Sequence, residues 1–423
     1  MIKKIIGTTG AKFFNAILAF LIVLLNTNYL GAEGYGTISL IILNIAIVLI
    51  FNDLIAGPIV YFASRIELLK LIIPAYLWAL LTATVITIIL YFIRQISPFI
   101  IHVFALSFIF SMSSFNMNYL LGRERIAIYN TINVLQISLI ILALLFFFLI
   151  MKEISILSYL YSLYTGYILT FLLSFIFILK YLRIVSLKEI FADIKRILNF
   201  GFYSQSANIF QLLNRRLSYY YIEFLLPNGR FLLGIFSAGV RLSESIWMVG
   251  QSVSLVQFAR ISNTKDMEYA RKITLSLLKF TFCFTLFILV VLLLLPAYFY
   301  IFLFGEDFTH VKVVIVSLSI GILSIAVSMM FSHYFSGTGR PKYNMYSSLT
   351  AFVFTVFLGY IFIPRYGLVG AGLVASFSYI CATIFQMVIF LKLTKTRLRE
   401  FLIHKEDIRL IKSIFSNLRN KSK

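Results

Sequence analysis

Charged residues are scarce in this 423-residue sequence, at 13% of the chain, whereas about 25% is typical of soluble domains. Hydrophobic residues make up 61%, and the mean hydropathy is +0.96. This composition excludes an ordinary soluble domain. The apolar runs reach roughly 20 residues and lack the alternation of membrane strands, so helices are favoured over a barrel. We therefore predict an all-α integral membrane protein.

Cysteine and histidine are also rare, and neither is arranged as a site. Cys283 and Cys381 lie inside apolar runs, and the four histidines are scattered without ligand spacing. The sequence therefore indicates no disulfide framework, metal centre or other cofactor. The polar connections are too short for a soluble catalytic domain, so we expect that the protein is not an enzyme.

Long hydrophobic runs make up most of the sequence. We predict about twelve transmembrane helices. They cover, within a few residues at each end, 9–30, 36–62, 71–93, 97–120, 129–150, 155–180, 199–226, 233–260, 274–299, 312–336, 344–363 and 367–391. Residues 1–30 resemble a signal peptide, but no small-x-small cleavage site follows, so we expect an uncleaved first helix.

The net charge of +21 is explained by topology rather than by nucleic acid. With the amino terminus inside, the inner loops and the tail hold 28 of the 37 basic residues, and both termini are predicted to be cytoplasmic. The segment from Lys392 onward alone carries ten of these, for which binding of anionic lipid is the expected role.

An internal repeat divides the chain in the middle. Residues 119–130 (YLLGRERIAIYN) resemble residues 334–344 (YFSGTGRPKYN) when one gap is allowed, and each segment follows the fourth predicted helix of its half. The offset of about 215 residues spans six helices, so the repeat is parallel, and the substrate site is expected between the halves. We predict two six-helix lobes, residues 1–190 and 191–395, around a central cavity, followed by a basic tail, residues 396–423.

The predicted span 199–226 carries two adjacent arginines, Arg215 and Arg216, near its middle. A charged side chain at membrane depth costs roughly 2.5 to 3.5 kcal/mol, so such residues usually face protein or a water-filled cavity. Arg215 belongs to a polar face of this helix, whereas Arg216 points about 100° away. The polar face consists of Ser204, Asn208, Gln211, Arg215 and Ser218.

An arginine in a cavity offers five donors and a permanent charge, which suits a phosphate oxygen pair. We predict that Arg215, with Asn208 and Gln211, contacts the substrate, and we include Arg216 as a second candidate. The alternative is that the arginines snorkel to an interface or pair with an acid. The tyrosines at 219–221 are interpreted as interface anchors.

Four further residues are candidates. Arg241 lies three residues before Glu244 on one helical face, so this pair either lines the cavity or forms a self-contained ion pair. Glu244 is also a candidate for ion coupling. Asp53 lies in an apolar run, where a carboxylate binds a coupling proton or cation, or else bonds a neighbouring helix. Lys12 is a candidate substrate-binding cation in the first predicted helix.

Several glycine-rich or polar segments complete the pattern: Leu30-Gly-Ala-Glu-Gly-Tyr-Gly36, Asn52-Asp53-Leu54, Leu303-Phe-Gly-Glu-Asp-Phe308 and Tyr366-Gly-Leu-Val-Gly-Ala-Gly372. In this order and spacing, they resemble Wzx-type O-antigen and polysaccharide flippases of the multidrug/oligosaccharidyl-lipid/polysaccharide (MOP) exporter superfamily. The resemblance runs from about residue 5 to residue 390.

The resemblance implies a MATE-like fold of two lobes in the bacterial cytoplasmic (inner) membrane. It also implies alternating access and a substrate that is an oligosaccharide on undecaprenyl diphosphate. Membrane lipids, a coupling proton or sodium ion and other polysaccharide-assembly proteins are the expected partners. Two alternatives stay open: a cation-coupled multidrug exporter of the same superfamily, and a membrane O-antigen polymerase or ligase. The identity of the glycan is also open.

Overall fold

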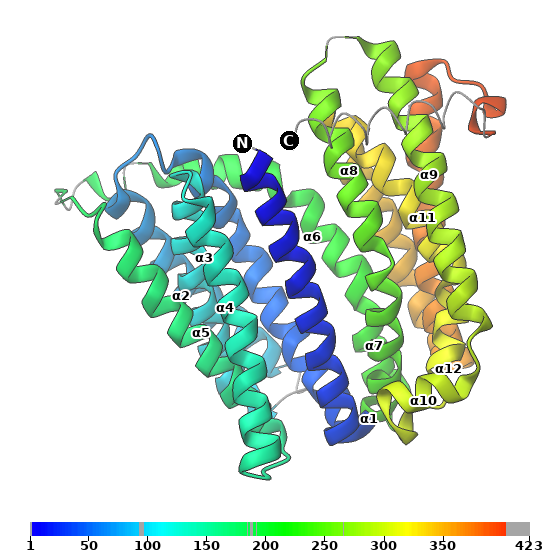
Figure 1. The fold of residues 1–423 in the computed structure, drawn as a ribbon, viewed down its shortest axis with the longest axis horizontal. Coiled ribbons are helices and arrows are strands. Elements are labelled where there is room, and N and C mark those ends of the chain that lie inside the picture. The colour runs from blue at the N-terminus through cyan, green and yellow to red at the C-terminus, as the bar shows by residue number, and fades with distance from the viewer. Residues whose placement is uncertain are drawn as a thin grey trace. The chain divides into compact units, whose positions relative to one another are not determined.

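The computed structural model describes residues 2–92, 97–183, 185–186, 189–191, 193–264 and 266–402, and these form helices joined by short connections (Figure 1). The chain divides into two compact units, and the boundary falls between Ile209 and Phe210. The predicted lobe limits of 190/191 and 395/396 stay a prediction.

The first unit begins with α1 (Ile2–Phe62), which is two helices joined at a reversal. Gly31 has non-helical dihedral angles (φ 66°, ψ −173°), and Figure 1 shows the blue ribbon turning back beyond its first half. A straight helix of 61 residues would be about 90 Å long, three times the hydrocarbon thickness. The remaining helices are α2 (Leu68–Phe92), α3 (Ile100–Gly122), α4 (Ile126–Leu145), α5 (Ile156–Leu179) and the start of α6 (Ile194–Leu225).

The second unit continues from α6 and ends with a second reversed helix. It contains α7 (Gly229–Ser245), α8 (Trp247–Ser262), α9 (Met267–Leu294), α10 (Ala297–Phe304), α11 (Val311–Gly337) and α12 (Lys342–Thr394). In α12 the non-helical residue is Gly367 (φ 56°, ψ −131°). The Ser347 hydroxyl donates to the Ala382 carbonyl at 3.0 Å, so the two halves of α12 pack antiparallel.

The prediction of an all-α integral membrane protein is confirmed. Eight helices within the described residues are long and apolar enough to cross a membrane, and α1 and α12 each contain two of the predicted spans. The number twelve stays a prediction, because α6, α7 and α8 are not among these eight. Both ends of the ninth predicted span, 274–299, were placed too late, because α9 runs from Met267 to Leu294. The chain leaves this helix before Pro296, which instead caps α10.

The repeat is visible in the turn that follows α3 and the turn that follows α11. In the first turn, the backbone N–H groups of residues 123, 124 and 125 donate to the carbonyls of 119, 121 and 120. In the second, those of residues 338, 339 and 340 donate to 334, 336 and 335, which is the same pattern shifted by 215. Both turns place a left-handed residue at the same position, Glu124 (φ 59°) and Gly339 (φ 74°).

The same offset relates a second pair of turns. Lys152, between α4 and α5, has φ 55°, and Gly367, within α12, has φ 56°. Left-handed backbone is uncommon, so two pairs at an offset of 215 residues are unlike chance similarity between apolar helices. The structure therefore confirms that corresponding turns of the two units share their local geometry.

A short 3-10 helix after α12, Leu398–Phe401, is tied to the start of α9. Arg271 donates to the carboxylates of both Glu268 and Glu400. The backbone N–H of Arg397 and the Arg271 guanidinium hold the pKa of Glu400 below its usual range. This end of the second unit is therefore cross-linked by charge before the described residues end at 402.

Candidate functional site

The central part of α6 is held against the first half of α12 within the second unit. Thr355 donates a hydrogen bond to the side-chain carbonyl of Asn214, which is buried, and the Tyr221 hydroxyl donates to the Val356 carbonyl at 3.0 Å. Gly359 lies directly beneath the Tyr221 ring, where an added Cβ would stand 2.5 Å from a ring carbon. These contacts fix the rotation of α6 and hence the directions of its two arginines.

The predicted polar face of α6 is present in part. Asn208 and Gln211 are exposed, and Asn208 donates to the Gln205 amide oxygen at 2.6 Å. Arg215 donates to the Gln211 side-chain oxygen at 3.3 Å. Ser218, the last residue of the predicted face, is buried at 2% exposure. The side chain of Ser204 lies outside the described residues.

Arg216 points away from this face and enters a partly buried ion pair. It donates to the Glu244 carboxylate at 2.9 Å and to the Tyr219 hydroxyl at 2.8 Å. Its guanidinium carbon also lies 5.2 Å from the centre of the Tyr219 ring. The side chains of Arg216 and Glu244 are only 16% and 17% exposed, so this pair is sheltered from solvent.

Glu244 forms its closest ion pair with Arg216 rather than with Arg241, which is its neighbour on the same helix. Arg241 and Glu244 approach only to 3.9 Å, whereas Arg216, on a different helix, approaches the same carboxylate oxygen to 2.9 Å. Arg216 reaches Glu244 from another helix, α6, so its guanidinium approaches the carboxylate more closely than Arg241 does from the same helix, α7. The Arg241 side chain remains 45% exposed, so it presents a second cation beside the pair.

The structure therefore brings together Arg215, Arg216, Arg241 and Glu244 from α6 and α7. Glu244 lies close enough to all three arginines to interact electrostatically with each. One carboxylate compensates one cation, so the cluster retains an excess of positive charge. Arg215 is ten residues before the end of α6, about 15 Å along the helix, which is half the usual hydrocarbon thickness. Such a cluster is suited to attract an anion and to hold it by paired N–H donors.

Two aromatic residues of this cluster were missed or misassigned by the sequence. Tyr219 was interpreted as an interface anchor, but it is 3% exposed and accepts the bond from Arg216. Tyr379, in the second half of α12, lies near Arg215 and packs edge-on against Trp247 with ring centroids 6.2 Å apart. The only sequence signal for Tyr219 was its position three residues after Arg216, and Tyr379 had none.

The two remaining candidates lie in the first unit. Asp53 is exposed, and none of the ion pairs among the described residues involves it. The neighbouring Asn52, by contrast, is buried and bonds Ser111 and Thr82, each at 2.7 Å. Lys12 is part of α1, but its side chain lies outside the described residues. The structure thus brings five of the candidates together, Gln211, Arg215, Arg216, Arg241 and Glu244, whereas Asp53 and Lys12 belong to the other unit.

Comparison with known structures defines the class of fold. The chain matches an inward closed conformation of the lipid II flippase MurJ at 16% identity and a TM-score of 0.75, covering 97% of this chain and 91% of that one. It also matches an inward-facing multidrug resistance MATE family transporter of the MOP superfamily at 16% identity and a TM-score of 0.69. The coverage there is 90% of this chain and 94% of the other.

A third match is a MOP superfamily transporter from Pyrococcus furiosus, with 14% identity, a TM-score of 0.66, and coverage of 93% and 96%. No family model and no curated protein sequence matches the chain. At this identity the structural matches show the fold, which is that of MOP superfamily transporters, and the predicted fold class is confirmed.

Proposed function

We propose that this chain is a flippase of lipid-linked glycans. It moves a short oligosaccharide on undecaprenyl diphosphate across the bacterial cytoplasmic membrane by alternating access, in the manner of a Wzx-type O-antigen or polysaccharide flippase. No covalent bond is made or broken. The sugar and the diphosphate cross in a polar passage while the prenyl tail stays in lipid.

The excess positive charge around Arg215 is the observation that carries this proposal. The diphosphate is a permanent anion, so its passage through an apolar bilayer requires fixed cations. Arg216 is neutralised by Glu244, whereas the described bonds of Arg215 go only to Gln211. Arg215 is therefore the cation available to a substrate, and Arg241 is the second. The fold shared with a lipid II flippase supports the same class of substrate.

The test is flipping of a fluorescent undecaprenyl-diphosphate oligosaccharide in proteoliposomes. Arg215→Ala should slow the initial rate by about tenfold or more, because a charge-assisted bond to phosphate is worth about 1.5 to 3 kcal/mol. Arg215→Lys should retain part of the rate, since it keeps the charge but loses the planar fork. Arg365→Ala, which removes an exposed arginine far along α12, is the matched control and should flip normally. An undiminished rate for Arg215→Ala would remove this residue from the mechanism.

A cation-coupled multidrug exporter is the second candidate, favoured by the MATE family matches and by the exposed Asp53 in α1. The arginine cluster argues against it, because a positively charged site repels cationic drugs. Asp53→Asn discriminates the two roles. If Asp53 couples transport to an ion gradient, the variant should lose the response of the rate to pH or sodium. If the response is unchanged, Asp53 is a structural residue.

The third alternative, a membrane polymerase or ligase, lacks support in the described residues. The connections predicted to lie outside include short turns such as residues 151–155 and 226–228, which offer no platform for catalytic groups. The glycan itself, whether O-antigen, capsule or teichoic-acid unit, is decided by contacts with the sugars rather than with the diphosphate.

A further inference from the structure

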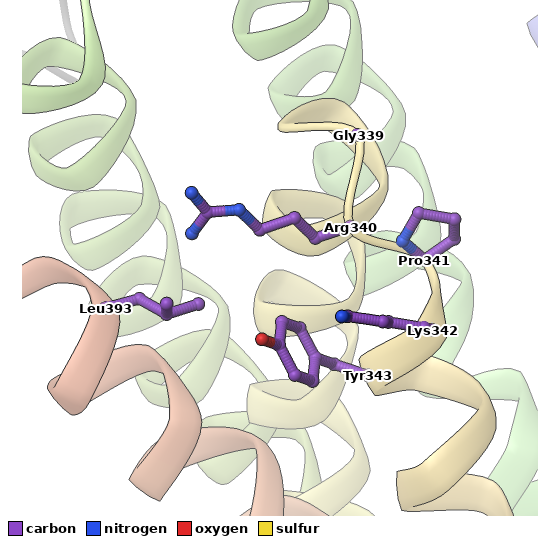
Figure 2. Close-up of a pocket in the computed structure, with 6 residues that line it drawn as sticks. All are labelled: Gly339, Arg340, Pro341, Lys342, Tyr343 and Leu393. Carbon is purple, nitrogen blue, oxygen red and sulfur yellow. The ribbon is translucent and has the colours of Figure 1, made fainter.

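A pocket lies at the end of the second unit where α11 turns into α12, away from the arginine cluster on α6. It has a volume of about 560 Å³. The lining residues are Gly339, Arg340, Pro341, Lys342, Tyr343 and Leu393. Figure 2 shows the side chains of Arg340, Lys342 and Tyr343 extending from the turn and the start of α12 toward Leu393, on the second half of α12. The pocket thus combines two cations with an aromatic and an aliphatic wall.

Comparison with the first unit shows that, in the part of the chain that the structure describes, the guanidinium of Arg340 lacks the partner that its counterpart has. Its counterpart in the first unit, 215 residues earlier, is Arg125, whose guanidinium donates to the Tyr181 hydroxyl at 3.1 Å. Arg340 occupies the same position of an equivalent turn, because its backbone N–H repeats the bond that Arg125 makes. Among the described residues, however, its guanidinium donates no hydrogen bond and joins no ion pair.

The segment equivalent to the one that bonds Arg125 takes another path in the second unit. The residue equivalent to Tyr181 is Thr396, which is small and bonds Thr394 at 2.7 Å. The preceding residue, Lys395, is left-handed (φ 53°), whereas its counterpart Lys180 is right-handed (φ −62°). The segment after α12 therefore leaves the site that its counterpart fills, and a pocket remains beside Arg340.

A stripe of exposed apolar side chains runs along α12 from Lys342, which is one of the residues that line the pocket. From Lys342, the helical spacing i+4, i+7 and i+11 leads to Tyr346, Leu349 and Val353, which are 44%, 37% and 42% exposed. The opposite face of the same helix, with Ser347, Ala351 and Thr355, is buried. A stripe of exposed large hydrophobic side chains on a membrane helix is suited to acyl chains, and the basic residues at its end to a headgroup.

We propose that this pocket binds the headgroup of an anionic phospholipid. Arg340 and Lys342 hold the phosphate, Tyr343 and Leu393 enclose the glycerol, and one acyl chain follows the stripe of Tyr346, Leu349 and Val353. The apolar stripe favours a lipid over a soluble phosphate ion, because a phosphate ion would contact only the two cations. The basic residues predict that this end of the unit is cytoplasmic, where anionic lipids attract them. The proposal is independent of the transported substrate.

The test is titration of the detergent-purified full chain with phosphatidylglycerol, followed by native mass spectrometry. Phosphatidylcholine and inorganic phosphate are titrated alongside. The wild type should bind one phosphatidylglycerol at this site more tightly than phosphatidylcholine. Arg340→Ala with Lys342→Ala should weaken this binding about thirtyfold, since each cation near a membrane surface contributes about 1 kcal/mol. Arg183→Ala with Lys195→Ala removes the same charge from exposed positions in the first unit and should change the affinity less than twofold.

A second variant fills the pocket without changing its charge. Leu393 is 38% exposed, so Leu393→Trp is tolerated by the fold and occupies the lining. It should also weaken phosphatidylglycerol binding, and it keeps the test decisive if the double variant is unstable. Unchanged binding in either variant would overturn the proposal. Equal affinity for inorganic phosphate would show an anion site rather than a lipid site, and equal affinity for phosphatidylcholine would remove the role of the cations.

Discussion

Two adjacent arginines of α6 have different surroundings because consecutive residues of a helix differ by about 100° in direction. Arg216 enters the partly buried pair with Glu244, and Arg215 stays on the face of Gln211. The sequence could predict this division, since only Arg215 shared a face with Asn208 and Gln211. It could not predict the partner of Arg216, because Glu244 lies 28 residues away on another helix and had a nearer arginine at Arg241. Pairing across helices depends on their rotation, which contacts such as Asn214 with Thr355 determine.

Removing the carboxylate of Glu244 should destabilise the second unit. Glu244→Gln leaves the largely sheltered Arg216 uncompensated, which costs about 3 kcal/mol, or roughly 5 °C in the apparent unfolding temperature of a chain this large. Thermal unfolding in detergent measures this. Glu153→Gln, which neutralises an exposed glutamate, is the control. The account of the pair is wrong if Glu244→Gln unfolds at the wild-type temperature.

Replacing both partners should be less harmful than replacing one. In Arg216→Met combined with Glu244→Leu, no buried charge is left alone, and much of the lost stability should return. The same unfolding measurement gives the coupling between the two sites. Strictly additive losses would mean that the two side chains do not interact.

At the scale of elements, the turns carry the repeat more clearly than the helices. The sequence predicted the match between residues 119–130 and 334–344 because polar and glycine residues stand out against apolar helices. It did not reveal that Lys152 corresponds to Gly367, because the residue types differ while the backbone conformation is the same. The sequence also predicted loops at residues 31–35 and 364–366. In the structure, the helix on each side is interrupted only at one non-helical glycine, Gly31 in α1 and Gly367 in α12.

The two equivalent left-handed residues predict opposite effects of substitution. Lys152→Gly should raise stability, because glycine adopts positive φ without the cost of about 1 kcal/mol that a side chain carries. Gly367→Ala should lower it by about the same amount, although nothing lies within 4 Å of the added Cβ. Unfolding temperatures of the two variants decide this. A shift of the same sign in both would contradict the assignment of the turns.

Close backbone packing of α6 on α1 gives a further prediction within the first unit. A Cβ on Gly201 would stand 1.7 Å from the Leu54 carbonyl oxygen, which is backbone and cannot move alone. Gly201→Ala should therefore separate the two helices and cost about 1 to 3 kcal/mol or more. Gly250→Ala, where the nearest atom would be 3.4 Å away, is the control and should be close to neutral. The yield and unfolding temperature of the folded protein report the difference.

At the scale of the whole molecule, composition alone gave the class. A chain with 13% charged residues and long apolar runs has to satisfy its backbone within helices, so the all-α membrane fold was predictable. The grouping of the site residues into one cluster was harder to predict. Arg215, Arg216, Arg241 and Glu244 were each identified from the cost of charge in apolar surroundings, but their common cluster required the packing of α6, α7 and α12. Under the proposed function, the excess positive charge of that cluster favours an anionic substrate over a cationic drug.

The central claim is that the transported group is a lipid-linked diphosphate. One measurement tests it most directly: initial rates of flipping by the wild-type protein in proteoliposomes, compared for the same oligosaccharide on undecaprenyl diphosphate and undecaprenyl monophosphate, with efflux of a cationic dye alongside. We predict that the diphosphate is flipped fastest, the monophosphate more slowly, and the dye no faster than in protein-free vesicles. Efflux of the dye, with the glycan lipid moving only at the protein-free rate, would contradict the account.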